Sequence, residues 1–186
     1  ARVWSAQGRH AEALAQLDEA LRITQEAAAA DAGNQAAAPR VQALQALRLE
    51  VLVQSGQWPA ARQLSTAVLA ALPAGNAKSF GAQRTRASGL LWAARAWHGA
   101  DARRALALAQ EAALLMQPTR PGDDNASRRW LLAQALGEQA QALRAAGEPD
   151  AAARAAREAL SQWQAAPAAV PPALQVWVDA ARALAP

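Results

Sequence analysis

The chain has 186 residues, no cysteine and a formal net charge of +4. The absence of cysteine excludes a disulfide scaffold, a thiol nucleophile and a thiolate metal site. Alanine makes up nearly a third of the residues, Leu, Gln, Arg and Glu follow, and no run alternates apolar with polar residues, so the sequence predicts an all-α protein. No stretch approaches the ~18 consecutive apolar residues of a membrane span.

The positive charge is concentrated in the middle of the chain. Residues 78–130 carry nine basic residues against four acidic ones, and nearly all basic residues are arginines. Such a patch would steer an acidic partner toward the protein, and the alternative is the ordinary solvated surface of an arginine-rich helical protein. A nucleic-acid role is disfavoured, because the arginines are not interleaved with aromatic residues.

Helical periodicity and turn residues divide the chain into nine helical segments. The first seven residues fit the end of a helix that continues upstream. The other helices are expected over residues 10–30, 39–55, 59–72, 84–98, 102–116, 126–146, 149–164 and 172–184. Asp101 is a predicted N-cap, as is either Asp124 or Asn125. Residues 74–83 and 118–125 are expected to be loops.

Four glycines mark corners between successive helices. Gly8, Gly56, Gly99 and Gly147 are 48, 43 and 48 residues apart, and similar alanine-rich segments follow each of them. A recurrence of this length is typical of stacked helix pairs. Such stacks build surfaces that hold another molecule and seldom carry chemistry of their own.

The pattern around these glycines resembles the tetratricopeptide repeat. In that family a glycine closes the first helix of a pair, an aromatic residue follows two positions later and an alanine five positions later. Gly56, Trp58 and Ala61 match this pattern, followed by Leu64, Val68 and Pro73. Gly8 with Ala13 and Gly147 with Ala152 match it in part, whereas Ala105 comes one position late after Gly99. The repeats are longer than the usual 34 residues, as in kinesin-light-chain-like and bacterial signalling members.

The resemblance implies one domain, a right-handed α-solenoid of about four helix hairpins and a capping helix. The repeats would cover residues 1–35, 36–80, 81–120 and 121–168, and the capping helix 171–186. Because the first repeat lacks half of its first helix, we expect the chain to be a fragment of a larger protein.

In this family the first helices of the pairs line the concave face, where ligands bind. The candidate groove residues placed there by the resemblance are Glu50, Gln54, Arg86, Ala93, Arg95, Trp97, Gln134, Gln141 and Arg144. Their polar groups suit an extended or acidic peptide. The family's clamp for acidic chaperone tails is not found, since Ala43, Ala46, Gly89 and Gly137 stand at several of its positions.

The tryptophans are expected to fill gaps in the alanine-rich core, with the exception of Trp97, which is a candidate contact residue. His98 and Asp101 are too weak a pair to predict catalysis, because Asp101 is needed as an N-cap. Asp123, Asp124 and Asn125 resemble half of a calcium loop, but no glutamate follows at the required spacing. We therefore expect no enzymatic activity, no metal site and no cofactor in this chain.

The sequence thus predicts a scaffold or sensor module that binds a protein or peptide. Its composition is similar to that of proteins from high-GC bacteria, in which such repeats often accompany a serine/threonine kinase or a DNA-binding regulator. A cytoplasmic location is expected, and a periplasmic one if the parent is a transmembrane kinase. A self-association module and a small-molecule-sensing helical domain of a transcription regulator are the alternatives.

Overall fold

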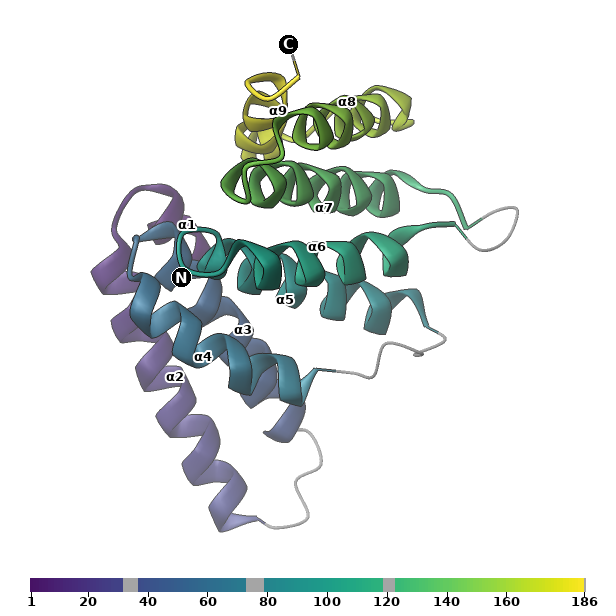
Figure 1. Ribbon diagram of the computed structural model, residues 1–186. Helices are drawn as coiled ribbons and strands as arrows, with labels where there is room; N and C mark the ends of the chain where they lie inside the picture. Colours follow the sequence, from purple (N-terminus) through teal and green to yellow (C-terminus); the bar gives the residue numbers. More distant parts are fainter. Residues whose placement is uncertain (32–36, 73–78, 119–122, 186) are drawn as a thin grey trace. The chain divides into compact units, whose positions relative to one another are not determined.

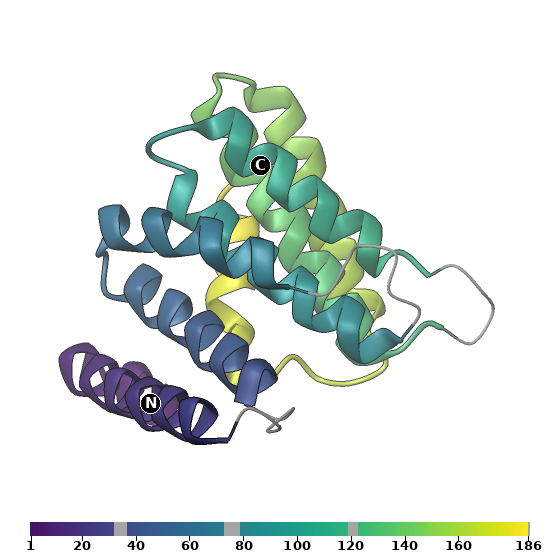
Figure 2. The same cartoon turned by 90° about the horizontal axis from the view of Figure 1, so that it is seen from below.

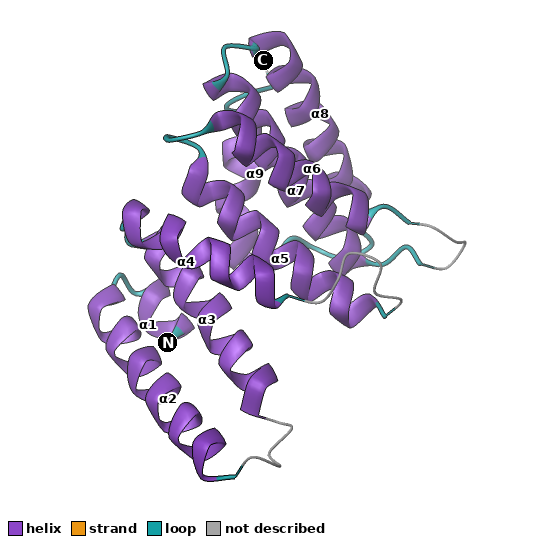
Figure 3. Ribbon diagram, turned by 60° about the horizontal axis from the view of Figure 1, so that its bottom comes forward, coloured by secondary structure: helices purple, strands orange, loops and turns teal. Residues whose placement is uncertain are grey.

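The computed structural model describes residues 1–31, 37–72, 79–118 and 123–185. Every regular element in these ranges is a helix, so the all-α prediction is confirmed for them (Figures 1 and 3). The contacts divide the chain into two compact units, residues 1–72 and 73–186, whereas the sequence analysis treats it as one domain. Much of the predicted loop over 74–83 and part of the loop over 118–125 lie outside the described residues.

Unit 1 contains four helices in two antiparallel hairpins. They are α1 (Arg2–Ala6), α2 (His10–Ala30), α3 (Ala37–Gln54) and α4 (Trp58–Ala71). Helix α3 packs against each of the other three helices. A small core forms where α2 meets α3, with Ala13, Leu17 and Val51 fully or almost fully buried.

Unit 2 contains two longer hairpins and a short terminal helix. Its elements are α5 (Phe80–Trp97), α6 (Ala102–Met116), α7 (Ala126–Ala145), α8 (Pro149–Ala165), the 3₁₀ turn η1 (Pro172–Leu174) and α9 (Gln175–Arg182). Helix α7 lies at the centre, because it packs against α5, α6, α8 and α9. The first helices of the two hairpins, α5 and α7, are therefore direct neighbours.

Three of the four corner glycines build the same helix end. Gly8, Gly56 and Gly147 have positive φ angles of 75°, 71° and 82°. At Gly147 the amide donates to the Arg144 carbonyl over 3.1 Å, and the next amide, of Glu148, donates to the Leu143 carbonyl over 2.9 Å. The equivalent pairs of bonds occur at Gly8 and Gly56, so all three corners are Schellman motifs.

The corner at Gly99 differs from the other three. Its φ angle is not positive, and the amides of Ala100 and Asp101 both donate to the Trp97 carbonyl. The side chain of Asp101 accepts a hydrogen bond from the Arg104 amide over 2.9 Å, which confirms the predicted N-cap. Because Asp101 adds one residue between Gly99 and the start of α6, the buried alanine, Ala105, comes one position late.

The alanines that follow the corners are core residues. Ala13, Ala61, Ala105 and Ala152 are at most 2% exposed. A methyl group in these positions lets the paired helices approach closely, and larger neighbours fill the space beside it. The predicted close packing of the hairpins is thus confirmed within each unit.

Two helices begin more than two residues away from the predicted start. Helix α5 begins at Phe80 rather than at residue 84, because the hydroxyl of Ser79 accepts a hydrogen bond from the Ala82 amide and caps it. The last predicted helix, over residues 172–184, is a 3₁₀ turn followed by the eight residues of α9. Asn125, one of the two alternatives, is the N-cap of α7.

Candidate binding surface

Helix α5 presents two chemically different sides. On one side Arg86 and Trp97 contact α6: Nη2 of Arg86 lies 2.6 Å from Oε1 of Glu111. Cζ of Arg104 lies 4.0 Å from the centroid of the Trp97 ring, a distance at which a cation attracts the face of an aromatic ring. Of the candidate groove residues, these two therefore face the second helix of their own hairpin.

The other side of α5 faces α7 and α9. Cζ of Arg95 lies 4.3 Å from the ring centroid of Trp177 on α9 and 5.9 Å from that of Trp92. The rings of Trp92 and Trp177 meet edge to face, with centroids 5.9 Å apart. Arg95 and Arg86, both predicted for one groove, thus lie on different sides of the helix.

A buried carboxylate lies between α5 and α7. Glu138 is 2% exposed; its Oε2 lies 2.8 Å from Nε2 of His98, and its Oε1 lies 3.5 Å from Nε of Arg95. Burial of a carboxylate is costly unless a cation offsets it, and the guanidinium of Arg95 on α5 is the cation beside Glu138. His98 thus faces Glu138 rather than the Asp101 that the sequence suggested as a partner.

Glu138 was missed in the sequence because the predicted groove residues on α7 were chosen by their place in the repeat. The available signal was its position as the single acid within the otherwise uncharged stretch between Arg129 and Arg144. A lone acid in a helical stretch without other charges is a candidate for a buried ion pair.

Trp177 anchors α9 on a face rich in tryptophan. Together with Val178 it joins one apolar cluster with residues of α5, α7 and α8. We call the receiving part of this cluster the α9 seat; it consists of Trp92, Trp130, Ala133, Leu160 and Trp163. The position of α9 against these helices can be followed in Figure 2.

The predicted role of the tryptophans in packing is confirmed for most of them. Trp163 and Trp177 are buried, and Trp4, Trp92 and Trp130 are half-buried members of core clusters. Trp58 is an exception, because 44% of it is exposed. Trp58 follows the Gly56 corner by two residues and is not covered by unit 1.

Of the remaining candidate residues of unit 2, three lie along α7 and one lies on α5. Gln134 is buried, and its Nε2 donates to the carbonyl of Trp130 over 3.1 Å. Gln141 is half-buried and Arg144 is exposed. Ala93, on α5, is completely buried and offers no surface to a ligand.

The two candidate groove residues in unit 1, Glu50 and Gln54, contact side chains of α1. Nη2 of Arg2 lies 3.1 Å from Oε2 of Glu50. The Ser5 hydroxyl donates to Oε1 of Gln54 and also lies 3.0 Å from Nδ1 of His10. A ligand at Glu50 or Gln54 would have to compete with these contacts from α1.

A small pocket of about 170 Å³ lies where α6 ends and α7 begins. Its lining includes Arg128, Arg129 and Asp124, of which Arg129 and Asp124 form an ion pair. Arg128 is 5% exposed, and its Nη1 donates to the carbonyls of Leu115 and Gln117 over 3.2 and 3.3 Å. These bonds satisfy carbonyls that the end of α6 leaves free.

Neither a metal cluster nor a membrane span is found in the described ranges. No three His, Asp or Glu side chains lie close enough together there to hold a metal ion. None of the helices there combines the length and the apolar character needed to cross a bilayer. Comparison of the chain with family models, with characterised proteins and with solved structures gives no significant match.

Proposed function

We propose that this chain is a non-catalytic binding module that holds a segment of a partner protein on unit 2, along the side where α5 and α7 are neighbours. The observation that carries the proposal is α9. This helix of eight residues is held against α7 and α8 by a buried face that includes Trp177, which packs against Arg95 and Trp92 of α5. Holding a short amphipathic helix in a groove is a common mode of peptide recognition.

The fold proposed for this module is a right-handed solenoid of about four tetratricopeptide-like hairpins with α9 as the capping helix. Three equivalent Schellman corners and the buried alanines that follow them support the repeat assignment. The repeat family and the handedness of the stack are part of the proposal. So is the parent protein, a larger bacterial regulator such as a serine/threonine kinase.

The chemistry of the surface favours an acidic partner. Exposed arginines such as Arg84 and Arg103 add to the positive charge of residues 78–130. Their charge would raise the association rate of an acidic segment, and the effect would weaken with added salt.

A display library of random helical and extended peptides, screened against the immobilised chain, tests the proposal. We expect saturable binders enriched in acidic residues. Replacement of Arg95, Gln141 and Arg144 together by alanine is expected to weaken their binding at least about tenfold, a typical loss when several contact residues are truncated. A matched control replaces three exposed arginines outside residues 78–130, Arg40, Arg154 and Arg157.

The possible results separate the parts of the proposal. Loss of binding in the first variant but not in the control supports the predicted groove. Equal binding by both variants would show that Arg95, Gln141 and Arg144 are not contact residues. If no peptide binds in a saturable way, the module does not recognise peptides.

A second candidate function is the sensing of a small anionic molecule. The pocket at the end of α6 favours it, because the buried guanidinium of Arg128 has no acidic partner among the described residues and its Nε has no hydrogen-bond partner there. A thermal-shift screen with small carboxylates and phosphates tests this function. A compound that raises the melting temperature of the wild type but not of Arg128→Met would support it.

A further inference from the structure

The attachment of α9 to unit 2 is narrow. Its buried residues are Trp177, Val178 and Ala181, with Leu184 just beyond its end. They follow one another at positions i, i+1, i+4 and i+7, which is one face of a helix. An isolated helix of this length is unstable in water, so α9 depends on its contacts with the seat for its helical form.

The opposite face of α9 is exposed, and its hydrogen bonds and ion pairs with described residues lie within the helix. Nε2 of Gln175 donates to Oδ1 of Asp179 over 3.0 Å, and Nη1 of Arg182 lies 3.2 Å from the same oxygen. Val176 is 56% exposed. The polar side chains of α9 therefore add no bond to the seat.

The segment that leads to α9 does not tie it to the rest of the unit by backbone hydrogen bonds. In this described stretch, no backbone amide or carbonyl of residues 167–170 takes part in such a bond. Pro167 and Pro171 lack an amide hydrogen and restrict the backbone. Val170 and Leu174 pack against the same cluster, so they would leave the seat together with α9, while residues 167–170 act as a short spacer without backbone hydrogen bonds to break.

The seat itself is larger and more aromatic than the helix it holds. Trp92, Trp130 and Trp163 come from three different helices, and Arg95 adds a cation beside them. The indole Nε1 atoms of Trp130 and Trp163 are buried without a hydrogen-bond partner. Buried donors without an acceptor are costly, so an occupant that supplied a side-chain oxygen to either indole would bind better than α9 does.

We propose that α9 is an exchangeable occupant of its seat, and that the seat receives a short amphipathic helix from a protein partner. The pattern of α9 defines this partner helix: a tryptophan, a small residue four positions later and a leucine seven positions later. A carboxylate or amide side chain near the tryptophan would accept hydrogen bonds from the unpaired indoles and from Arg95. The proposal rests on the proposed function and names its site, its ligand class and its internal competitor.

The experiment uses the full chain and a fluorescein-labelled peptide of residues 170–186, which contains α9. In the wild type the tethered α9 competes at a high effective concentration and weakens the apparent affinity of the peptide. Trp177→Ala removes the anchor of the tethered copy. We expect this variant to bind the peptide at least about tenfold more tightly than the wild type does.

The matched control is Val176→Ala, which changes the exposed face of the same helix. It should bind the peptide as weakly as the wild type does, and a peptide carrying Trp177→Ala should not bind any of the proteins. If Trp177→Ala keeps the circular dichroism of the wild type but binds the peptide no more tightly, the proposal is overturned.

Hydrogen exchange of the wild type provides a test that needs no folded variant. The amides of α9 should exchange at least about tenfold faster than those of α8, because α9 opens locally while unit 2 remains folded. Equal protection of the two helices would overturn the proposal that α9 leaves its seat. A wild-type dimer in sedimentation that Trp177→Ala abolishes would overturn the partner assignment, since a second copy would then supply the helix.

These results are independent of the library screen. If selected peptides bind the chain but neither Trp177→Ala nor the α9 peptide affects them, the binding function stands and the α9 seat is the wrong site. If no library peptide binds while the α9 peptide binds Trp177→Ala, the seat is exchangeable and general peptide recognition fails.

Discussion

Three corner glycines hold a backbone conformation that other residues adopt only at a cost. With a φ angle of 82°, Gly147 lies in the left-handed region, whereas Gly99 does not. A Cβ atom added at either position would meet no atom within 4 Å. The two sites therefore differ in backbone conformation and not in steric space, which makes them a matched pair.

Gly147→Ala is expected to destabilise unit 2 by about 1 kcal/mol, because alanine resists the left-handed conformation. Gly99→Ala should change the free energy of unfolding by no more than about 0.5 kcal/mol. Urea unfolding followed by tryptophan fluorescence measures both values. Equal destabilisation by the two substitutions would contradict the Schellman assignment.

Glu138 is the residue whose charge matters most to unit 2. Glu138→Gln keeps the shape of the side chain but leaves His98 and Arg95 without a buried carboxylate. We expect a loss of about 2 kcal/mol of stability, because an uncompensated charge near the interior is costly. Glu158→Gln, at an exposed position on α8, is the control and should be nearly neutral. If Glu138→Gln leaves the stability of unit 2 unchanged, the ion pair contributes little to it.

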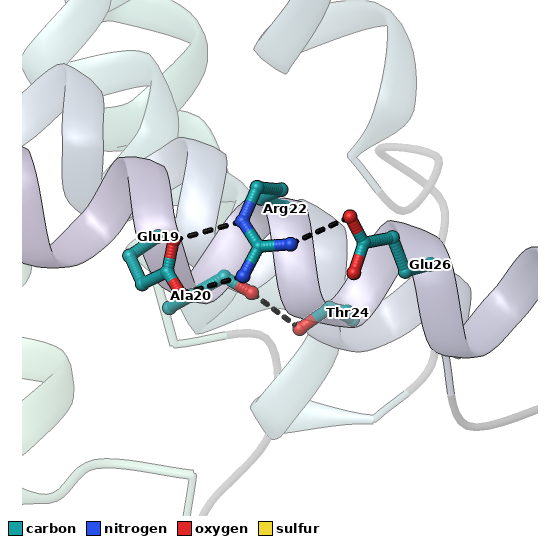
Figure 4. A network of polar contacts seen from close by, with 5 residues as sticks. All are labelled: Glu19, Ala20, Arg22, Thr24 and Glu26. Atoms are coloured by element: carbon teal, nitrogen blue, oxygen red, sulfur yellow. Dashed lines mark hydrogen bonds and ion pairs between the residues drawn. The ribbon is translucent and has the colours of Figure 1, made fainter.

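At the scale of the element, the surface of α2 carries networks of paired charges. Nη2 of Arg22 lies 2.7 Å from Oε1 of Glu19 and its Nη1 lies 2.6 Å from Oε1 of Glu26, as Figure 4 shows. The hydrogen bonds from Arg22 hold the pKa of Glu19 below its ordinary value, and those from Arg9 do the same to the pKa of Glu12. Both carboxylates are therefore more stable as anions in the helix than in the unfolded chain.

The sign of the pH dependence follows from these lowered pKa values. The stabilisation is complete above the ordinary pKa of glutamate, about 4.3, and is lost as the pH falls through the lower value in the helix. A peptide of residues 9–31 should thus lose helical circular dichroism between pH 6 and pH 3. The Arg22→Gln peptide should be less helical at pH 6 and show a smaller loss. Identical pH profiles would contradict the role of Arg22.

The helices differ in how well their sequences predicted them. The corner glycines, the cap of α6 and the long amphipathic α2 were predictable, because local propensity and hydrogen bonding within a few residues determine them. The start of α5 was not, since Ser79 was one of several polar residues in the expected loop. The 3₁₀ turn before α9 was also missed, because the periodicity of apolar residues does not separate it from the helix that follows.

The candidate site was predicted less well than the helices. The repeat pattern identified α5 and α7 as neighbours in the predicted groove, and the structure places them in contact. The repeat pattern assigned Arg86, Trp97 and Arg95 to one groove. In the structure Arg86 and Trp97 face α6, whereas Arg95 faces Glu138 and Trp177. A rotation of a few tens of degrees about a helix axis decides such contacts, and helical spacing alone does not determine it.

At the scale of the whole molecule, each unit has its own buried core. Among the described residues, more apolar side chains are buried in unit 2, including Trp163, Trp177 and Met116, than in unit 1. Because a domain needs enough buried surface to offset its chain entropy, we expect unit 2 to be the more stable part.

A fragment of residues 73–186 should therefore fold alone. We expect one cooperative urea transition with coincident circular dichroism and tryptophan fluorescence, the behaviour of a two-state domain. The fragment of residues 1–72 should unfold at a lower urea concentration. A fragment of unit 2 that is helical but melts without cooperativity would contradict the assignment of an independent core.

The sequence by itself determined the helical class, the corners and the small residues at the helix contacts, because these depend on backbone propensity and on neighbours three to five positions away. Only the tertiary structure decided that Glu138 is buried between two basic side chains and that Trp177 brings α9 onto α5, α7 and α8. Those contacts join residues far apart in the chain. Their geometry follows from how whole helices rotate and pack, which no local pattern records.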